Sequence, residues 1–217
     1  MRRTFATSLT ALSLATLGAT ACAKDPTAGK TEAAVAEAKQ VEAAPAAAQR
    51  LVITPAESKI GFVGAKVTAQ HVGEFRDFEG KIALVDGKLE GGQIEFAVKP
   101  ASVLVDGGLP KLEGHLVSPD FFDAAKYPEA RFVSTEIKPG SETAGMTHTV
   151  TGNLEIRGTR RSVTFPALVE MANDMVRAKT EFGINRKDFG IQYPGMPDDL
   201  IKDNVLIRVD LKAPRAN

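Results

Sequence analysis

The stretch GHLVSPDFFDAAKYPEARF, residues 114–132, gathers the side chains of this sequence that could carry out catalysis. His115 lies close to Ser118, Asp120 and Asp123. A histidine beside a carboxylate is the usual pair for general acid–base chemistry, and a serine next to such a pair would be the nucleophile of a hydrolase. With His115 and Asp120 as acid and base, this stretch is the first candidate for an active site.

The surroundings of these residues favour an architectural role instead. The other two histidines, His71 and His148, are far from His115 in the sequence, so no pair has the spacing of metal ligands, and no G-x-S-x-G motif frames a serine. Ser118-Pro119-Asp120 is typical of a helix end or cap. We therefore expect a short helix here, anchored by two adjacent phenylalanines over one end of the fold, with neither a metal site nor catalytic residues.

The composition excludes several classes of partner. The chain has 217 residues, of which 43% are hydrophobic and 25% charged, as in an ordinary globular protein with a real core. Basic and acidic residues balance at 27 each, so neither nucleic acid nor an anionic membrane surface is indicated as a partner. The oligomeric state cannot be inferred from the composition.

Residues 1–21 have the features of a signal peptide for export, which places the protein in the periplasm. Arg2 and Arg3 precede an apolar stretch that is too short to span a bilayer. Cys22, the only cysteine, follows Gly18-Ala19-Thr20-Ala21. The segment resembles a bacterial lipoprotein signal, although Ala19 stands where leucine is commonest. Lipid attachment to Cys22 would anchor the protein to a membrane, and simple cleavage after the A-x-A of residues 19–21 is the alternative.

Residues 22–50 are rich in Ala, Glu and Lys and contain little bulky apolar surface. Such a segment buries too little to offset the entropy of ordering it, so we expect a disordered linker behind a lipidated N-terminus. As a coil it would let the folded domain, residues 51–217, range about 30 Å from its anchor.

The folded domain is predicted to be all-β and antiparallel. Segments such as KIGFVGAKV, residues 59–67, alternate between apolar and other residues, and about eight such strands follow one another. Asp86-Gly87 is a strong hairpin signal. Short helices are indicated only within residues 108–122 and 196–204. Periodicity alone does not distinguish a sandwich from a barrel.

Large apolar side chains recur on the predicted inward faces and near the short helix. An eight-stranded barrel encloses room either for packed side chains or for one small ligand. These residues are therefore candidates for an apolar ligand cavity, or they simply fill a core: Ile60, Phe62, Phe78, Ile94, Phe96, Phe121, Phe122, Phe132, Phe165 and Phe182.

Five segments, in order, resemble the YceI-like family. They are ITPAESKIGFVGAKV, GEFRDFEGKI, GHLVSPDFFDAAKYPEARFVST, VTGNLEIRGTRRSVTFP and FGINRKDFGI. The resemblance implies an eight-stranded, lipocalin-like barrel of the periplasm that binds a polyisoprenoid or quinone-like lipid, with no catalytic cofactor. Glu57, where many relatives have histidine, and the absence of Trp are departures that put the ligand preference in doubt.

The expected function is noncovalent binding, storage or transport of a long-chain lipid, and not an enzymatic reaction. Two basic clusters are interpreted as structural: Arg186, Lys187 and Asp188 form a polar loop that could also hold a headgroup, and Arg157, Arg160 and Arg161 surround a hairpin turn. A stress-response or interaction module with a packed barrel, and an enzyme acting on an apolar substrate, are the alternatives.

Overall fold

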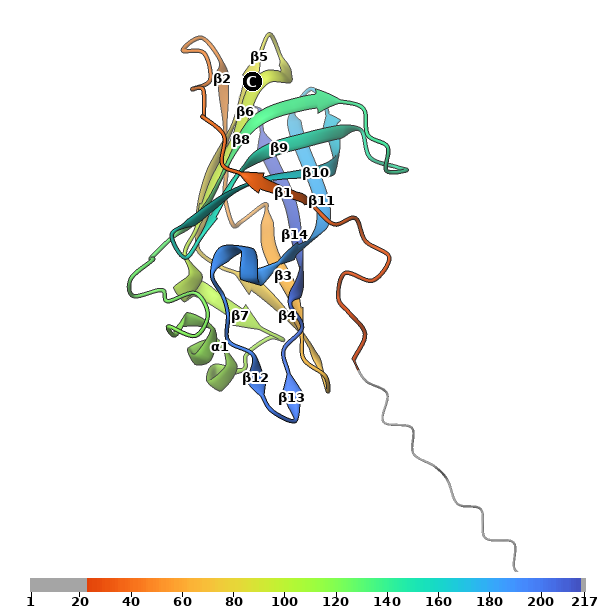
Figure 1. The fold of residues 1–217 in the computed structure, drawn as a ribbon. Helices are drawn as coiled ribbons and strands as arrows, with labels where there is room; N and C mark the ends of the chain where they lie inside the picture. The colour runs from red at the N-terminus through yellow and green to blue at the C-terminus, as the bar shows by residue number, and fades with distance from the viewer. Residues whose placement is uncertain (1–22, 216–217) are drawn as a thin grey trace, which may run out of the picture.

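The computed structural model describes residues 23–215, and most of them form antiparallel strands (Figure 1). The strands are β1 (Ala34–Glu37), β2 (Gln49–Ile53), β3 (Lys59–Ala65), β4 (Gln70–Phe75), β5 (Phe78–Val85), β6 (Lys88–Val98), β7 (Val103–Val105), β8 (Ala130–Pro139), β9 (His148–Ile156), β10 (Thr159–Met171), β11 (Met175–Asn185), β12 (Gly195–Met196), β13 (Asp199–Leu200) and β14 (Asn204–Pro214). The helices are α1 (Pro110–Val117) and the 3-10 turns η1 (Pro100–Ser102) and η2 (Arg186–Phe189).

One long sheet curls around the interior as an incomplete barrel. Its strands lie in the order β2-β5-β6-β8-β9-β10-β11-β14-β3-β4-β7, with β1 paired to β10, and β12 and β13 form a small hairpin of their own. Figure 1 shows α1, β7, β12 and β13 at one end of the molecule and the tips of β2 and β5 at the other. The predicted antiparallel all-β fold is confirmed, with more strands than the eight expected.

The predicted hairpin turn at Asp86-Gly87 is present between β5 and β6. Asp86 and Gly87 have φ of 49° and 76°, and Val85 pairs with Lys88 across them. Two adjacent residues with positive φ are the signature of the two-residue turn that matches the twist of a hairpin. The same pattern at Arg157-Gly158 joins β9 to β10, with φ of 52° and 73°.

The N-terminal segment lies against the barrel wall and closes a seam in it. Pairing between β10 and β11 covers only Leu168–Met171 of β10, and nearer the start of β10 its partner on that side is β1. On the other side of the seam, Gly183 of β11 donates its N–H to the carbonyl of Thr31 and accepts from the N–H of Ala33, both at 2.9 Å. We call residues 23–48 the strap.

The prediction of a disordered linker over residues 22–50, free to range from its anchor, is wrong for the part that the structure describes. The strap needs few apolar side chains because main-chain hydrogen bonds to β10 and β11 hold it, and an alanine-rich strand fits the narrow seam. Beyond β1 it crosses the outside of the sheet to β2 (Figure 1). Strand β2 begins at Gln49, slightly before the predicted start of the domain at residue 51.

Two further predictions concern helices. The helix expected within residues 108–122 is present as α1. The helix expected within residues 196–204 is wrong, because Gly195–Met196 and Asp199–Leu200 pair as β12 and β13. Pro197 and the adjacent Asp198 favour the turn between them over a helix.

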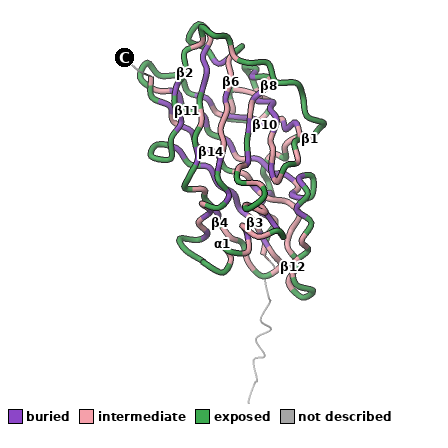
Figure 2. Tube along the Cα trace, turned by 90° about the vertical axis from the view of Figure 1, so that its left-hand side faces the viewer, coloured by how far each residue is buried: buried purple, intermediate pink, exposed green. Residues whose placement is uncertain are grey.

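Buried residues run along the strands of the wall, while exposed residues gather in the connections and around α1 (Figure 2). At the β2 and β5 end, fully buried aliphatic side chains such as Ile53, Ile82 and Leu84 fill the interior. Burying such side chains contributes about 1.5–3 kcal/mol each. This packed end supplies a stable frame for the opposite end.

We expect substitution of Asn153, which holds the strap, to destabilise the protein. The buried amide of Asn153 donates to the carbonyl of Lys39 at 2.7 Å and accepts from its N–H at 2.9 Å, fixing the strap where it leaves β1. Asn153→Ala should lower the free energy of unfolding by about 1–3 kcal/mol, because both bonds are lost. Urea unfolding measures this change, and limited proteolysis should show faster cleavage after residue 37.

Thr149→Ala, on the same strand, is the matched control, since the Thr149 hydroxyl donates to Gly140 in an exposed turn and does not contact the strap through that bond. Equal protease sensitivity of the two variants would contradict the assigned role of Asn153.

Candidate functional site

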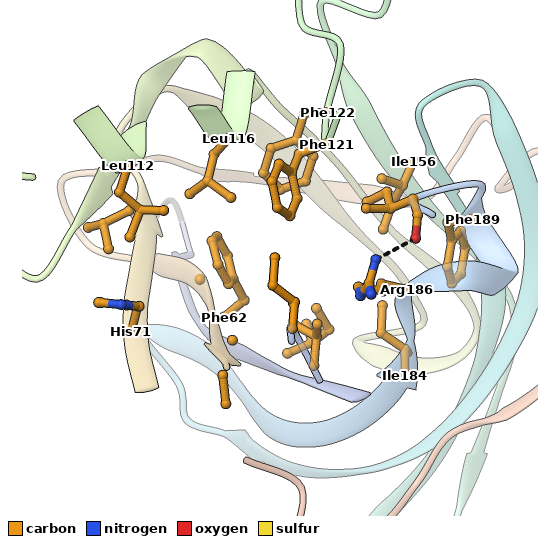
Figure 3. Close-up of a pocket in the computed structure, with 18 of the residues that line it drawn as sticks. Phe62, His71, Leu112, Leu116, Phe121, Phe122, Ile156, Ile184, Arg186 and Phe189 are labelled. Atoms are coloured by element: carbon orange, nitrogen blue, oxygen red, sulfur yellow. Dashed lines mark hydrogen bonds between the residues drawn. The ribbon is translucent and has the colours of Figure 1, made fainter. Parts of the chain in front are cut away.

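A cavity of about 820 Å³ occupies the end of the barrel beneath α1 (Figure 3). Its wall comes mainly from β3, β14, the second half of β11, α1 and the segment that follows β11, with further residues from β4, β6, β7, β8 and β9. Most of the lining side chains are aliphatic or aromatic, among them Leu112, Leu116, Ile156, Ile184 and Phe189. The volume falls in the range of about 300–1,000 Å³ that small-molecule sites occupy.

The predicted cavity residues divide into two groups. Six of them line the cavity: Ile60, Phe62, Phe96, Phe121, Phe122 and Phe182. The other four, Phe78, Ile94, Phe132 and Phe165, are buried in the surrounding core and do not line it. The inward faces of the strands thus serve both the cavity and the packed end.

A continuous row of phenylalanines runs along the wall of the barrel from β6 to β11. Phe96 and Phe182 line the cavity, and behind them Phe132 and Phe165 complete the row. Ring centroids are 5.3 Å apart between Phe96 and Phe132, 5.7 Å between Phe132 and Phe165, and 4.1 Å between Phe165 and Phe182. We call this row the aromatic floor, because it lies where the cavity lining meets side chains that are buried without lining the cavity.

Two glycines let large rings lie flat along the sheet. A Cβ at Gly73 would stand 2.4 Å from the Phe62 ring, and a Cβ at Gly152 would stand 2.4 Å from the Phe132 ring. Any side chain at these positions would push the ring inward. The rings therefore cover backbone and do not stand across the interior.

The two adjacent phenylalanines that follow α1, Phe121 and Phe122, anchor the helix over the barrel, as predicted. Phe122 packs edge-on against Phe62 and Phe75, with ring centroids 6.1 and 5.7 Å apart. Phe121 packs against His115 and Tyr193, at 5.0 Å between the His115 and Phe121 rings. These contacts fix α1 as the roof of the cavity.

Sequence reasoning missed several lining residues, and some of them had left a signal. Val205, Ile207 and Val209 alternate along β14 and all line the cavity, so their period of two could have identified that face. Leu112 and Leu116 are one helical turn apart on α1 and both point inward (Figure 3). Tyr193 has no comparable pattern, since it lies in an irregular segment.

A family model for the YceI-like domain matches residues 51–213. The chain belongs to the YceI-like family. A UPF0312 protein of Pseudomonas fluorescens is 33% identical over 178 residues, which cover 74% of this chain and 86% of that protein. A UPF0312 protein of Pseudomonas putida strain W619 is 34% identical over 129 residues, and the match spans 65% of its length.

Solved structures share the fold of this YceI-like domain. The crystal structure of Burkholderia cenocepacia BcnA is similar over 74% of this chain and 99% of its own, at 27% identity and a TM-score of 0.62. A polyisoprenoid-binding domain from Saccharophagus degradans is similar over 77% of this chain and 98% of its own, at 15% identity and a TM-score of 0.59. At 15% identity the likeness shows the fold alone.

Several charged groups at the mouth of the YceI-like cavity are paired. Lys66 forms an ion pair with Asp199, and the ring of His71 contacts Asp106 at 2.7 Å between Nδ1 and Oδ2. Burial alone would raise the pKa of Asp106, but hydrogen bonds from His71 and from the N–H of Val72 outweigh it and lower the pKa. Asp106 therefore stays ionised and keeps its partner.

The candidate acid–base pair is present as a contact. His115 Nε2 and Asp120 Oδ2 are 2.9 Å apart, and both side chains are partly exposed. The hydroxyl of Ser118 accepts from the N–H of Asp120 at 3.3 Å, so it stabilises the turn after α1. The pair thus fixes the turn that carries Phe121 and Phe122.

The two basic clusters take the structural roles predicted for them. Buried Arg186 donates to the carbonyls of Ile191 and Lys202 and to the carboxylate of Asp203, and so holds the segment between β11 and β14. Burial lowers its pKa, while Asp203 opposes this change. Arg157 donates to the carbonyl of Phe121 at 3.0 Å. Arg160 and Arg161 pair with Glu155 and Glu37, respectively.

The predictions for the start of the chain fall outside the part that the structure describes. The signal peptide over residues 1–21 and lipid attachment at Cys22 lie outside the described residues, 23–215. Within that range no three His, Cys, Asp or Glu side chains gather in a way that could hold a metal ion. None of the helices between residues 23 and 215 has the length and apolar character needed to cross a membrane.

We expect Glu113, on the roof helix α1, to titrate in a way that reports the attachment of the helix. The carboxylate of Glu113 accepts from the N–H groups of Val105 and Leu109, each at 3.0 Å, and these bonds lower its pKa. Since the unfolded value is about 4.3, the bonds stabilise the attachment of α1 fully above that pH. The stabilisation is lost as the pH falls through the lower folded pKa.

Nuclear magnetic resonance should show the amides of Val105 and Leu109 shifting together, with a midpoint below pH of about 4.3. Glu113→Gln should abolish this transition while the fold stays intact. The same transition in the Gln variant would assign it to another group.

Proposed function

We propose that this YceI-like domain binds a long-chain isoprenoid or a similar apolar lipid noncovalently, in the cavity beneath α1. The protein would act in the periplasm, tethered to a membrane by lipidated Cys22, and would store or carry its ligand without changing it chemically. The observation that supports this proposal is the size and apolar lining of the cavity.

Water inside such an apolar cavity makes few hydrogen bonds with the lining. The cavity opens at a mouth, so water fills it when no ligand is bound. An apolar occupant displaces this water and packs against the lining, which is favourable because apolar surface leaves water on both sides.

The ligand class follows from the energetics of chain burial. Each buried CH₂ contributes about 0.8 kcal/mol, so enclosing roughly ten carbons contributes about 8 kcal/mol before the cost of ordering the chain. No catalytic group is required for this. The structurally similar domain from Saccharophagus degradans is a polyisoprenoid-binding domain, which supports an isoprenoid as the first ligand to test.

A polar headgroup would remain at the mouth. Three lysines that line the cavity stand at or beside the ends of elements: Lys66, Lys111 and Lys202. They would contact a headgroup weakly, since they are partly exposed to water. Selectivity would come chiefly from the length and shape of the apolar tail.

The direct test is isolation of the protein from its native envelope, followed by extraction and mass spectrometry of bound lipid. We expect a long-chain isoprenoid or quinone-like lipid in amounts close to that of the protein. Protein that contains no lipid, and that binds no solanesol offered in detergent, would refute the proposal.

Gly64 offers a substitution that fills the cavity without a clash. It lines the cavity from β3, and a Cβ there would meet only the Phe62 ring, at 4.0 Å. Gly64→Phe should occupy the space of the ligand and reduce bound solanesol at least tenfold, with no loss of thermal stability. Binding is measured with radiolabelled solanesol and stability by thermal unfolding.

Gly114→Leu is the matched control, because Gly114 lies on α1, does not line the cavity, and has open space where its Cβ would be. It should bind solanesol like the original chain. Undiminished binding by Gly64→Phe would place the ligand elsewhere.

The contact between His115 and Asp120 is the one observation that favours an enzyme as the second candidate. Asp120→Asn removes the carboxylate of the proposed acid–base pair and lies outside the cavity lining. We expect this variant to retain its bound lipid, chemically unaltered, as the original chain does. A chemically different lipid in the variant, found by mass spectrometry of the extracts, would favour the enzyme.

A further inference from the structure

Exposed apolar side chains gather around the mouth of the cavity. Among the described residues, Leu109, Met196 and Leu200 are large hydrophobic side chains with 39%, 61% and 50% of their surface exposed. Leu109 precedes α1, whereas Met196 and Leu200 belong to the β12–β13 hairpin. Because Leu109 and Met196 also line the cavity, they mark its opening. We call Leu109, Met196 and Leu200 the mouth rim.

The described chain begins at this same rim. The N–H of Ala23 donates to the carbonyl of Val67 at 2.7 Å, and the N–H of Val67 donates to the carbonyl of Leu200 at 3.0 Å. The side chain of Gln70 donates to the carbonyl of Lys24 at 2.7 Å. Two successive hydrogen bonds thus connect the start of the strap to the mouth rim, and Figure 1 shows the chain entering beside this end.

This attachment changes what an anchor at Cys22 would do. One residue spans at most about 3.6 Å, so an acyl chain on Cys22 would leave the protein very close to the amide of Ala23. The strap beyond that point is bonded to the barrel wall, as described above. The anchor would therefore hold the mouth end, rather than the whole domain on a loose tether, against the bilayer.

We propose that the mouth rim docks on the surface of a lipid bilayer, so that the cavity opens toward the membrane and lipid passes between them without crossing water. The inference rests on the proposed function and extends it to the source of the ligand. Apolar side chains on adjacent connections suit the boundary between headgroups and acyl chains. Around the hairpin, Lys66 and Lys202 balance Asp198 and Asp199 in formal charge, and Lys66 pairs directly with Asp199, so little net charge opposes this contact.

The test measures which end of the protein meets the membrane. The full chain is produced in a Gram-negative host, purified from membranes, checked for acylation by intact mass, and placed in vesicles of phosphatidylethanolamine and phosphatidylglycerol in equal amounts. The sequence has 1 cysteine. Since acylation consumes that thiol, a second cysteine is the only site for a fluorescent label sensitive to its environment.

Leu200→Cys and Val52→Cys are the matched pair. Val52 lies on β2 at the packed end and is 60% exposed, against 50% for Leu200. We expect the label at 200 to shift to the blue on vesicles and to be quenched several-fold more than the label at 52 by a lipid-borne quencher. Equal quenching, stronger quenching at 52, or a chain that is neither acylated nor bound to vesicles would overturn the inference.

A second measurement separates this inference from the proposed function. Leu200→Asp should slow uptake of solanesol from vesicles at least tenfold while binding of solanesol presented in detergent is unchanged, since Leu200 does not line the cavity. Val52→Asp should affect neither. Normal uptake from vesicles by Leu200→Asp would refute docking alone, and failure of every form to bind solanesol in detergent would refute the binding function.

Discussion

The interior of this barrel is governed by a competition between filling space with its own side chains and leaving space open. A glycine beside a large ring decides locally in favour of open space. The rings of Phe62 and Phe132 lie along the sheet, over Gly73 and Gly152, rather than across the interior. The aromatic floor lies where the packed core meets the hollow end. Because the packed end supplies the stability, the hollow end can remain open without unfolding the wall around it.

The wall itself depends on the strap. Between β10 and β11 the sheet would otherwise present unpaired backbone groups beside the interior, which is unfavourable in a folded protein. The strap supplies partners to both strands, and Ala33 and Val35 pack against the core. A segment with hardly any bulky side chains is therefore part of the barrel, and the start of the described chain is joined to its mouth.

The sequence was sufficient for the parts of the fold that depend on local pattern. Alternation identified inward faces, and Asp86-Gly87 formed the predicted turn. Alternation reports which side a residue faces but not its depth along the barrel, which is why Phe78 and Ile94 were placed with the cavity residues. The strap was missed because its stability comes from backbone pairing, which leaves no apolar period in an alanine-rich segment.

The ion pairs at the mouth matter because they lie beside the opening of an apolar cavity. Exposed pairs such as His71 with Asp106 contribute little to stability. They do, however, satisfy charges that would otherwise have to be stripped of water when an apolar chain or a bilayer approached, and an unpaired charge is far more costly to desolvate than a pair with its hydrogen bonds made. A rim that combines such pairs with exposed leucine and methionine side chains thus favours contact with hydrocarbon over contact with a polar group.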